Sequence, residues 1–346
     1  MPLPPLSAAL LSLAVSIVMV SGARAGEVRV EDLAVHDPFV LADKGTKTYY
    51  LYGGFRTADP ALGGKQKAAG VKVYTSQDLR TWTGPSIVYQ MAEDFWADKE
   101  ASPWAPEVHE YRGKYYLFTT FHQWDRDQPP VGNDRAVKRR GSQVLVADSP
   151  MGPFKPLRNR PTTPDSDFTL DGTLWIEDGK PYMVYCHEWI QRGGGTFEAV
   201  PLSDDLAEAT GKPFVLFAAK EAAWARTTNS YRGTATGNAV SDGVWLHRTR
   251  GGKLLMLWSS WTESRAYGEG LAVSESGTLK GPWKQVGDEP IQQDDRGHGM
   301  IFEGFDGRLV HCLHRYFNMP ATRVQFWEIT DTGDSLKVGK QLLGAE

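Results

Sequence analysis

Short apolar strands joined by tight polar turns recur along almost the whole chain, and hardly any stretch has the 3.6-residue period of an amphipathic helix. The clearest units are five hairpins, in each of which a turn containing glycine separates two strand-like runs rich in apolar and aromatic residues. The hairpins read DPFVLADKGTKTYYLYGG from position 37, WAPEVHEYRGKYYLFTTF from 104, DGTLWIEDGKPYMVYCHEW from 171, DGVWLHRTRGGKLLMLWSSW from 242 and HGMIFEGFDGRLVHCLHRY from 298.

A further strand and a bend follow each of the first four hairpins, and the strand RVQFWEIT follows the fifth. The hairpin starts are 67, 67, 71 and 56 residues apart. A unit of about four strands that repeats four to eight times is typical of a β-propeller. The sequence therefore predicts an all-β fold, a five-bladed β-propeller that forms a single domain over residues 26–346, with no break in composition near its middle.

The first residue of each hairpin lies about eight residues before its turn, which at roughly 3.3 Å per residue places all five at one level of the central channel. These residues are Asp37, Trp104, Asp171, Asp242 and His298. A single aspartate at the start of a strand is commonly a turn-forming residue. Three carboxylates that converge on one axis are different, because their repulsion lowers stability unless they serve a function.

Composition narrows the class of protein. The chain has 346 residues, of which 41% are hydrophobic and 23% charged, with 12 Trp, 13 Tyr, 14 Phe and only 2 Cys. These values exclude a disordered chain and a disulfide scaffold. The net charge of −4 gives no basic field for nucleic acid, and we interpret the one basic run, RAVKRR at 135–140, as a solvated loop. Cys186 and Cys312 are predicted to be buried free thiols, although an oxidising compartment would allow them to pair.

The N-terminal segment predicts export. An apolar run at residues 7–20 is too short for a stable membrane anchor, and Ala23-Arg24-Ala25 matches a signal-peptidase site. We predict a signal peptide at 1–25, a secreted or periplasmic mature protein, and no membrane association after cleavage. The start MPLPPL lacks the usual basic residues, so an uncleaved anchor or a misassigned start codon is the alternative.

An acidic ring suits glycosidic bond hydrolysis, which needs one carboxylic acid to protonate the leaving oxygen and one carboxylate to activate water or attack the sugar. A third acidic neighbour can raise the pKa of the acid. The sequence has no P-loop, dinucleotide fingerprint, HExxH motif, cysteine zinc spacing or GxSxG elbow. The predicted partner is an oligo- or polysaccharide substrate.

Five ordered blocks resemble the signature of glycoside hydrolase family 43: HDPF at 36–39, WAPEV at 104–108, LDGTLW at 170–175, SDGVWL at 241–246 and GHGMIF at 297–302. The resemblance implies inverting hydrolysis of arabinose-, xylose- or galactose-containing glycans, as in α-L-arabinofuranosidases and β-xylosidases. It also implies that Asp37 is the general base and that Asp171 tunes the pKa and orientation of the acid. His298 matches a central histidine that several relatives associate with bound calcium, so calcium in the channel is an optional cofactor and none is required.

The general acid is where this sequence departs from the family, which usually has a glutamate before Gly-Pro at the start of the fourth blade. In this chain the residue is Asp242, whose side chain is one methylene shorter. Reflection through the turn at 178–179 predicts that Glu188 lies beside Asp171, where an acid would be tuned. We favour Glu188 as the acid, with Asp242 as a substrate-binding residue or a substitute acid.

Other residues could line the pocket or pack in the core. Trp104, His122, His187, His298 and Arg315 are candidate substrate-binding residues, and Glu107 is predicted to be structural. Candidate sugar platforms, for each of which core packing is an equal alternative, are Trp96, Trp124, Trp189 and Trp261. The missing glutamate at position 242 leaves a second hypothesis, a catalytically inactive propeller that binds glycans.

Overall fold

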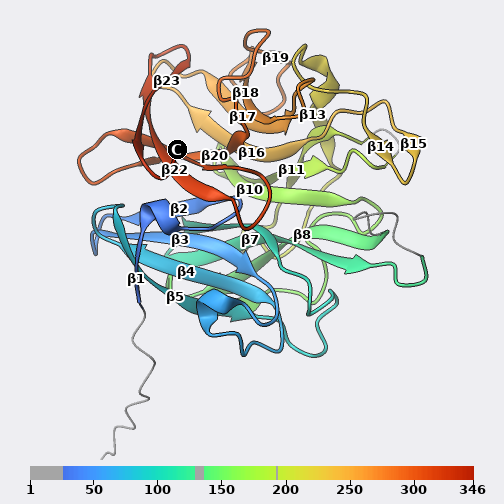
Figure 1. Cartoon of the computed structure of the whole chain (residues 1–346). Helices are drawn as coiled ribbons and strands as arrows, with labels where there is room; N and C mark the ends of the chain where they lie inside the picture. The colour runs from blue at the N-terminus through green and yellow to red at the C-terminus, as the bar shows by residue number, and fades with distance from the viewer. Residues whose placement is uncertain (1–25, 129–135, 192–193) are drawn as a thin grey trace, which may run out of the picture.

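The computed structural model describes residues 26–128, 136–191 and 194–346. The predicted signal peptide at 1–25 lies outside these residues and stays a prediction. Five sheets follow one another around the molecule in chain order, and the predicted five-bladed propeller is confirmed (Figure 1). The helices of the described ranges are three short 3-10 turns, and none is long and apolar enough to cross a membrane.

Each blade is an antiparallel sheet whose four strands follow one another from the channel outward. Blade 1 consists of β2 (Phe39–Asp43), β3 (Thr48–Phe55), β4 (Gly70–Ser76) and β5 (Thr81–Gln90). Blade 2 consists of β6 (Trp104–Tyr111), β7 (Lys114–Trp124), β8 (Val137–Ala147) and β9 (Lys155–Pro156). Blade 3 consists of β10 (Thr169–Glu177), β11 (Lys180–His187), β12 (Thr196–Pro201) and β13 (Phe214–Ala218).

Blade 4 consists of β16 (Asp242–Arg248), β17 (Leu254–Trp261), β18 (Tyr267–Ser274) and β19 (Trp283–Gln285). Blade 5 consists of β20 (Arg296–Glu303), β21 (Leu309–Arg315), β22 (Arg323–Asp331) and β23 (Leu336–Leu343). The remaining elements are β1 (Glu27–Arg29), the hairpin of β14 (Ser230–Tyr231) and β15 (Thr234–Ala235), and the 3-10 turns η1 (Val30–Asp32), η2 (Pro60–Leu62) and η3 (Ala219–Glu221).

The ring closes by packing, because blade 5 contains no strand from the N-terminus. The N-terminal strand β1 instead pairs with β5 at the outer edge of blade 1. After η1, the carbonyl of Leu33 accepts a hydrogen bond of 3.2 Å from the backbone N–H of Val324 in β22. Trp82 and Phe326, both fully buried, stack across the junction with ring centroids 6.3 Å apart. Blades 1 and 5 therefore share an apolar interface rather than a sheet.

Aromatic side chains line the channel below the level of the aspartates. Phe39, His109 and Trp245 come from the inner strands of blades 1, 2 and 4, and their ring centroids lie 5.3 to 6.1 Å apart. These three side chains narrow the channel beneath the aspartates.

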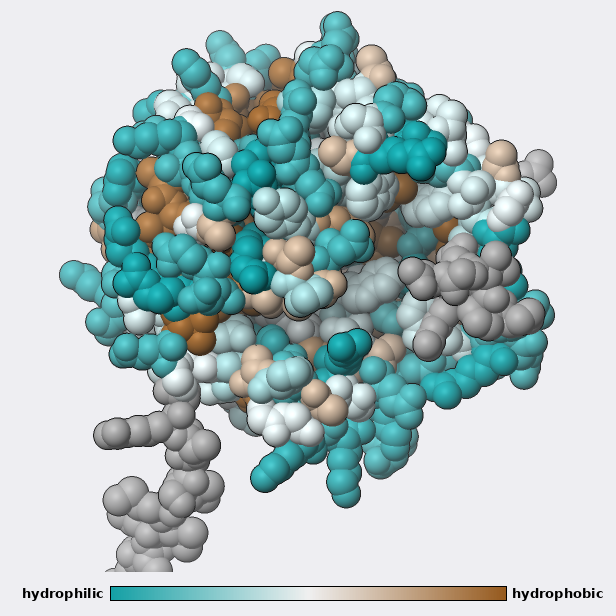
Figure 2. Space-filling view, in the orientation of Figure 1, coloured by the Kyte–Doolittle hydropathy of each residue, from teal (hydrophilic) through white to brown (hydrophobic). Residues whose placement is uncertain are grey.

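Two smaller predictions have opposite outcomes. Cys186 and Cys312 are buried free thiols, as predicted. The described part of the basic run is not a solvated loop, because residues 137–140 begin strand β8 and Arg140 is only 5% exposed. A carboxylate and two indole rings surround the charge of Arg140, which explains its burial. Elsewhere, hydrophilic residues cover most of the face in Figure 2, with apolar residues in patches between them.

We predict that Trp82→Ala lowers the free energy of unfolding by about 3–5 kcal/mol, because it removes a fully buried indole from the closing interface. Denaturant unfolding measures the change. Ile87→Ala, on the same strand but 41% exposed, is the matched control and should cost less than about 1 kcal/mol. Equal losses for the two variants would show that the stacked pair does not hold the ring closed.

Candidate active site

A backbone bulge at the start of the inner strands turns the candidate side chains toward the channel axis. The pairing of inner and second strands skips two residues after Trp104, Leu170, Asp242 and Gly297. One residue at the equivalent point of every blade has left-handed backbone dihedrals, with φ from 42° to 59°: Asp37, Ala105, Asp171, Gly243 and His298. Such a conformation costs about 1–3 kcal/mol for a residue with a side chain, so it needs support from its surroundings.

The support comes from the preceding blade, because a bulge leaves backbone N–H groups without partners in their own sheet. Thr120 Oγ1 accepts the N–H of Asp171 at 2.9 Å, and Ser259 Oγ accepts the N–H of His298 at 2.8 Å. At the same position of blade 5, His314 Nδ1 accepts the N–H of Asp37 at 3.2 Å. Each of these blades thus fixes the candidate residue of the next.

The predicted level of the ring is correct for blades 1, 3 and 5 and wrong by one residue for the other two. Ala105 and Gly243 occupy the bulge positions, one residue after Trp104 and Asp242. The bulge has the same form in blades 2 to 5, so it does not cause the difference; Trp104 and Asp242 lie one residue farther from their turns than the left-handed residues do, and a count of about eight residues does not resolve one position. Asp242 still reaches the axis, whereas Trp104 belongs to a neighbouring cluster.

Three carboxylates surround one imidazole nitrogen. His298 Nδ1 lies 3.0 Å from Asp37 Oδ1, 3.6 Å from Asp242 Oδ1 and 4.0 Å from Asp171 Oδ2. Asp171 also accepts the N–H of Gly243 at 3.0 Å. All four side chains are largely buried, with exposed fractions of 3 to 17%. The structure therefore brings together the four ring residues that can ionise.

The four central residues differ in their preferred charge. Burial alone would raise the pKa of Asp37, but the positive charges of His298 and His36 hold it well below its usual range. Burial and the charge of Asp242 raise the pKa of Asp171 well above its usual range. Hydrogen bonds from Asp171 and His298 outweigh burial and lower the pKa of Asp242. These shifts favour the carboxylate form of Asp37 and Asp242 and the protonated form of Asp171.

Burial opposes a charge on His298, but the neighbouring Asp37 carboxylate raises the pKa of this imidazole well above the usual histidine value. The cluster then contains one imidazolium, two carboxylates and one carboxylic acid. Tyr267 forms part of its wall: burial, followed by the charges of Asp242 and Asp37, raises the pKa of this phenol well above its usual value. The Tyr267 hydroxyl is a neutral donor beside Asp242.

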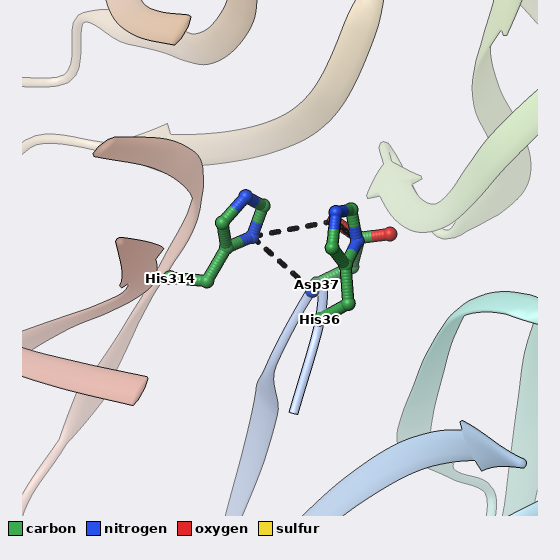
Figure 3. A group of neighbouring side chains, drawn as sticks. All are labelled: His36, Asp37 and His314. Carbon is green, nitrogen blue, oxygen red and sulfur yellow. Dashed lines mark hydrogen bonds and ion pairs between the residues drawn. The ribbon is translucent and has the colours of Figure 1, made fainter. Parts of the chain in front are cut away.

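Two histidines that the sequence analysis did not select flank Asp37 (Figure 3). His36 Nδ1 lies 2.8 Å from Asp37 Oδ1, and His314 Nδ1 lies 3.4 Å from the same oxygen. Burial and the charge of His36 keep the pKa of His314 well below its usual value, so its ring is neutral and Nδ1 can accept. His36 was within reach of sequence reasoning, because it precedes Asp37 in the first signature block. His314 was not, because its position depends on blade packing.

Glu188 is not beside Asp171 as predicted. It follows β11 and donates its backbone N–H to the carbonyl of Phe168 at 2.7 Å, three residues before Asp171. The uninterrupted ladder would already place Glu188 opposite residue 169, and the bulge shifts it by one residue more. Its buried carboxylate forms an ion pair with Arg140 of β8. Burial raises the pKa of Glu188 despite the opposing charge of Arg140, and the charge of Asp242 adds to the rise. The charge of Asp242 therefore opposes the ionisation of Glu188.

Arg140 connects Glu188 to an aromatic cluster. Its guanidinium carbon lies 4.2 Å from the ring centroid of Trp104 and 5.9 Å from that of Trp124. The ring of His122 lies between the indoles, 4.7 Å and 4.5 Å from them. Burial and the charge of Arg140 keep the pKa of His122 well below its usual value. Arg140, a residue missed by the sequence analysis, thus holds Glu188 next to Trp104 and His122.

The cluster of Arg140, Glu188, His122 and the two indoles contains three buried polar atoms that have no hydrogen-bond partner among the described residues. They are Arg140 Nε, Glu188 Oε2 and His122 Nδ1. Buried polar atoms in folded proteins are nearly always paired. Three unpaired ones at one mouth of the channel are suited to the hydroxyl groups of a sugar.

The remaining residues singled out from the sequence lie outside the two clusters described above or at their edges. His187 lies 2.9 Å from Glu198 and 2.7 Å from Gln191, so it is engaged within blade 3. Arg315 stacks on the neighbouring Tyr316, and Glu107 pairs with His109 at 2.9 Å in a structural role, as predicted. The indole candidates are partly exposed: Trp96, Trp124, Trp189 and Trp261.

The central residues do not fit a calcium site. Ligand atoms of Asp171, Asp242 and His298 lie within 4.8 Å of one another. Calcium takes six to eight oxygen ligands at 2.3–2.6 Å, whereas this set offers one nitrogen and two carboxylates. The nitrogen faces Asp37, and Asp171 Oδ2 already accepts an N–H. His298 itself supplies the positive charge, so we assign no role to calcium.

Comparisons with known proteins agree with this geometry. The model of the family described as "Glycosyl hydrolases family 43" matches residues 30–330. An endo-arabinase from Bacteroides thetaiotaomicron VPI-5482 is 34% identical, with 94% of this chain and 100% of that chain covered and a TM-score of 0.72.

Two more distant structures share the fold. An endo-1,4-beta-xylanase from the same organism is 21% identical over 90% of this chain and 98% of that chain, with a TM-score of 0.66. An alpha-L-arabinanase from Cellvibrio cellulosa, complexed with arabinohexaose, is 16% identical over 89% and 96%, with a TM-score of 0.61. With its five blades, its acidic ring and a family match that spans the propeller, the chain belongs to glycosyl hydrolase family 43.

Proposed function

We propose that this protein is an inverting glycoside hydrolase that cleaves arabinose-containing glycans, with Asp37 as the general base. The observation that carries the proposal is the unequal ionisation of the carboxyl groups at one channel mouth. Asp37 is held as a carboxylate, which can accept a proton from water, and Glu188 has a raised pKa, which suits a proton donor. Inversion needs this pairing of base and acid on opposite sides of the scissile bond.

Glu188 is the better candidate for the acid. Asp37 Oδ1 and Asp242 Oδ1 both lie within 3.6 Å of one nitrogen, so they are at most about 7 Å apart, at the lower limit for inverting enzymes. Asp242 is also held as a carboxylate, which cannot donate. We assign Asp242 to substrate binding and Asp171 to holding Asp242 and the Gly243 backbone in place.

Arg140, Trp104 and His122 form the proposed sugar-binding wall on the Glu188 side. An indole face stacks on the apolar face of a furanose or pyranose ring, and unpaired donors and acceptors bind its hydroxyls. The likeness to an endo-arabinase at 34% identity supports arabinose over xylose, and β-xylosides are the comparison substrates. Export through residues 1–25 is part of the proposal, since polymeric glycans lie outside the cell.

Asp37→Asn tests the base. The amide is nearly isosteric but accepts no proton from water, so we expect kcat/KM on arabinan oligosaccharides to fall more than about a hundredfold in a folded variant. Proton NMR of the first product formed by the wild-type enzyme should show the inverted anomer. Retained configuration or an active Asp37→Asn variant contradicts the assignment, and a wild-type protein that binds but cleaves no glycan points to the inactive propeller.

The choice of acid is tested with leaving groups. A nitrophenyl glycoside hardly needs protonation, whereas a natural glycoside does, so Glu188→Gln should lose about a hundredfold or more on oligosaccharides and less than about tenfold on the aryl substrate. The activity of the wild type should fall as pH rises through the pKa of Glu188, and this alkaline limb should flatten in the variant. Asp242→Asn should lose activity on both substrates alike. The reverse pattern makes Asp242 the acid.

Metal removal tests the poor fit to calcium. After dialysis against EDTA, kcat/KM should stay within about twofold of the untreated enzyme, because three protein ligands are too few for tight calcium binding. Added calcium should not raise it. A loss that calcium restores, and magnesium does not, would place a functional calcium ion in the protein.

A further inference from the structure

A buried acid–base pair lies between blades 4 and 5, apart from the residues of the proposed active site. Glu269 of β18 and His311 of β21 both have fully buried side chains, and Glu269 Oε2 lies 2.8 Å from His311 Nε2. Burial of a polar group is costly unless another polar group lies close to it, and His311 is the side chain that lies beside Glu269 Oε2. Neither residue belongs to the candidate site, so the pair needs a separate explanation.

The other carboxylate oxygen reaches the backbone beside the central histidine. Glu269 Oε1 accepts the N–H of Gly299 at 2.6 Å, next to the hydrogen bond from the His298 N–H to Ser259. Ser259 and Glu269 are paired across β17 and β18, so two adjacent side chains hold the two N–H groups of this bulge. A Cβ at position 299 would lie 2.1 Å from His311 Nε2 and 2.3 Å from Glu269 Oε1, which explains the glycine.

The same junction between blades 2 and 3 is built without charge. Thr120 and Ser142 are paired across β7 and β8 as Ser259 and Glu269 are across β17 and β18. Thr120 accepts the N–H of Asp171 at 2.9 Å, and Ser142 accepts that of Gly172 at 3.2 Å. A hydroxyl therefore suffices to satisfy this backbone position. Glu269 in blade 4 has a longer side chain than this backbone position requires, and its bond of 2.6 Å is shorter than the 3.2 Å bond of Ser142.

We propose that Glu269, which lies against His311 and accepts the N–H of Gly299, is a positioning residue that fixes the His298–Gly299 backbone so that His298 Nδ1 stays among the three aspartates. It contacts no substrate and acts through His298. The inference rests on the proposed function, in which that imidazole keeps Asp37 ionised. A rigid anchor is needed at this point because His298 has left-handed dihedrals and three competing partners.

Three variants test the proposal. Glu269→Gln keeps an acceptor for Gly299 and a donor for His311, so kcat should stay within about threefold of wild type. Glu269→Leu removes the acceptor, and kcat should fall at least about tenfold with KM within about twofold. His247→Gln is the matched control, because His247 pairs with Asp331 at 3.3 Å at the opposite end of the same blade junction. It should lower Tm without changing kcat.

Histidine ring NMR gives a readout that needs no turnover. In protein labelled with ¹³C and ¹⁵N histidine, the His298 ring signals, assigned with His298→Asn, should match wild type in Glu269→Gln and shift in Glu269→Leu. A folded Glu269→Leu variant with unchanged kcat and unchanged His298 signals overturns the proposal. If that variant does not fold, Glu269→Ser is measured in its place, because serine carries the same hydroxyl group that Ser142 supplies at the equivalent position of blade 2. The proposal expects a reduced kcat and shifted His298 signals in Glu269→Ser, and wild-type values overturn it.

The two proposals fail differently. Should the wild-type protein cleave no arabinose-containing glycan, the proposed function fails, while the His298 signals still report whether Glu269 positions the ring. Should the enzyme be active and the signals of Glu269→Leu unchanged, only the positioning role fails.

Discussion

The bulge at the start of the inner strands of blades 2 to 5, matched in blade 1 by the left-handed residue Asp37 ahead of β2, is the constraint on which the active site depends. It turns one left-handed residue per blade toward the axis and leaves backbone N–H groups that the blade cannot pair itself. The preceding blade supplies the acceptors, from Thr120, Ser259 and His314. The ring of blades must therefore be closed before the site is complete, and the packing of Trp82 on Phe326 across the closing junction bears on catalysis as well as on stability.

Because the three aspartates and His298 converge on the channel axis, each affects the charge of the others. Three carboxyl groups within 4.0 Å of a single nitrogen repel one another when ionised in a buried site, which favours a proton on one of them and a positive charge on the histidine. Asp37 gains most from that cation and becomes a carboxylate that is ready to take a proton from water. Glu188 lies in a different environment, with its charge opposed by burial, and can be the donor. The roles of base and acid required for glycoside hydrolysis thus follow from the different surroundings of Asp37 and Glu188.

The fold and the central ring could be predicted because both depend on repetition along the chain. Strand alternation, turn glycines and regular spacing indicated five blades, and equivalent positions in the repeats pointed to Asp37, Asp171 and His298. Features that depend on contacts between blades could not be found this way. Reflection through the turn placed Glu188 too close to Asp171, and the bulge moves it one residue farther away. Arg140 looked like part of a solvated basic loop, although it pairs with Glu188 of the neighbouring blade. His314 and Glu269 carry no local signal, since each acts on the backbone of a different blade.

The most direct test of this account is the carboxyl ¹³C NMR of aspartate-labelled protein at neutral pH. The account predicts one buried aspartic acid that remains protonated well above pH 4 and whose signal disappears in Asp171→Asn, while the signals assigned with Asp37→Asn and Asp242→Asn are those of carboxylates. Three ionised aspartates at neutral pH, or a proton on Asp37 in place of Asp171, would contradict it.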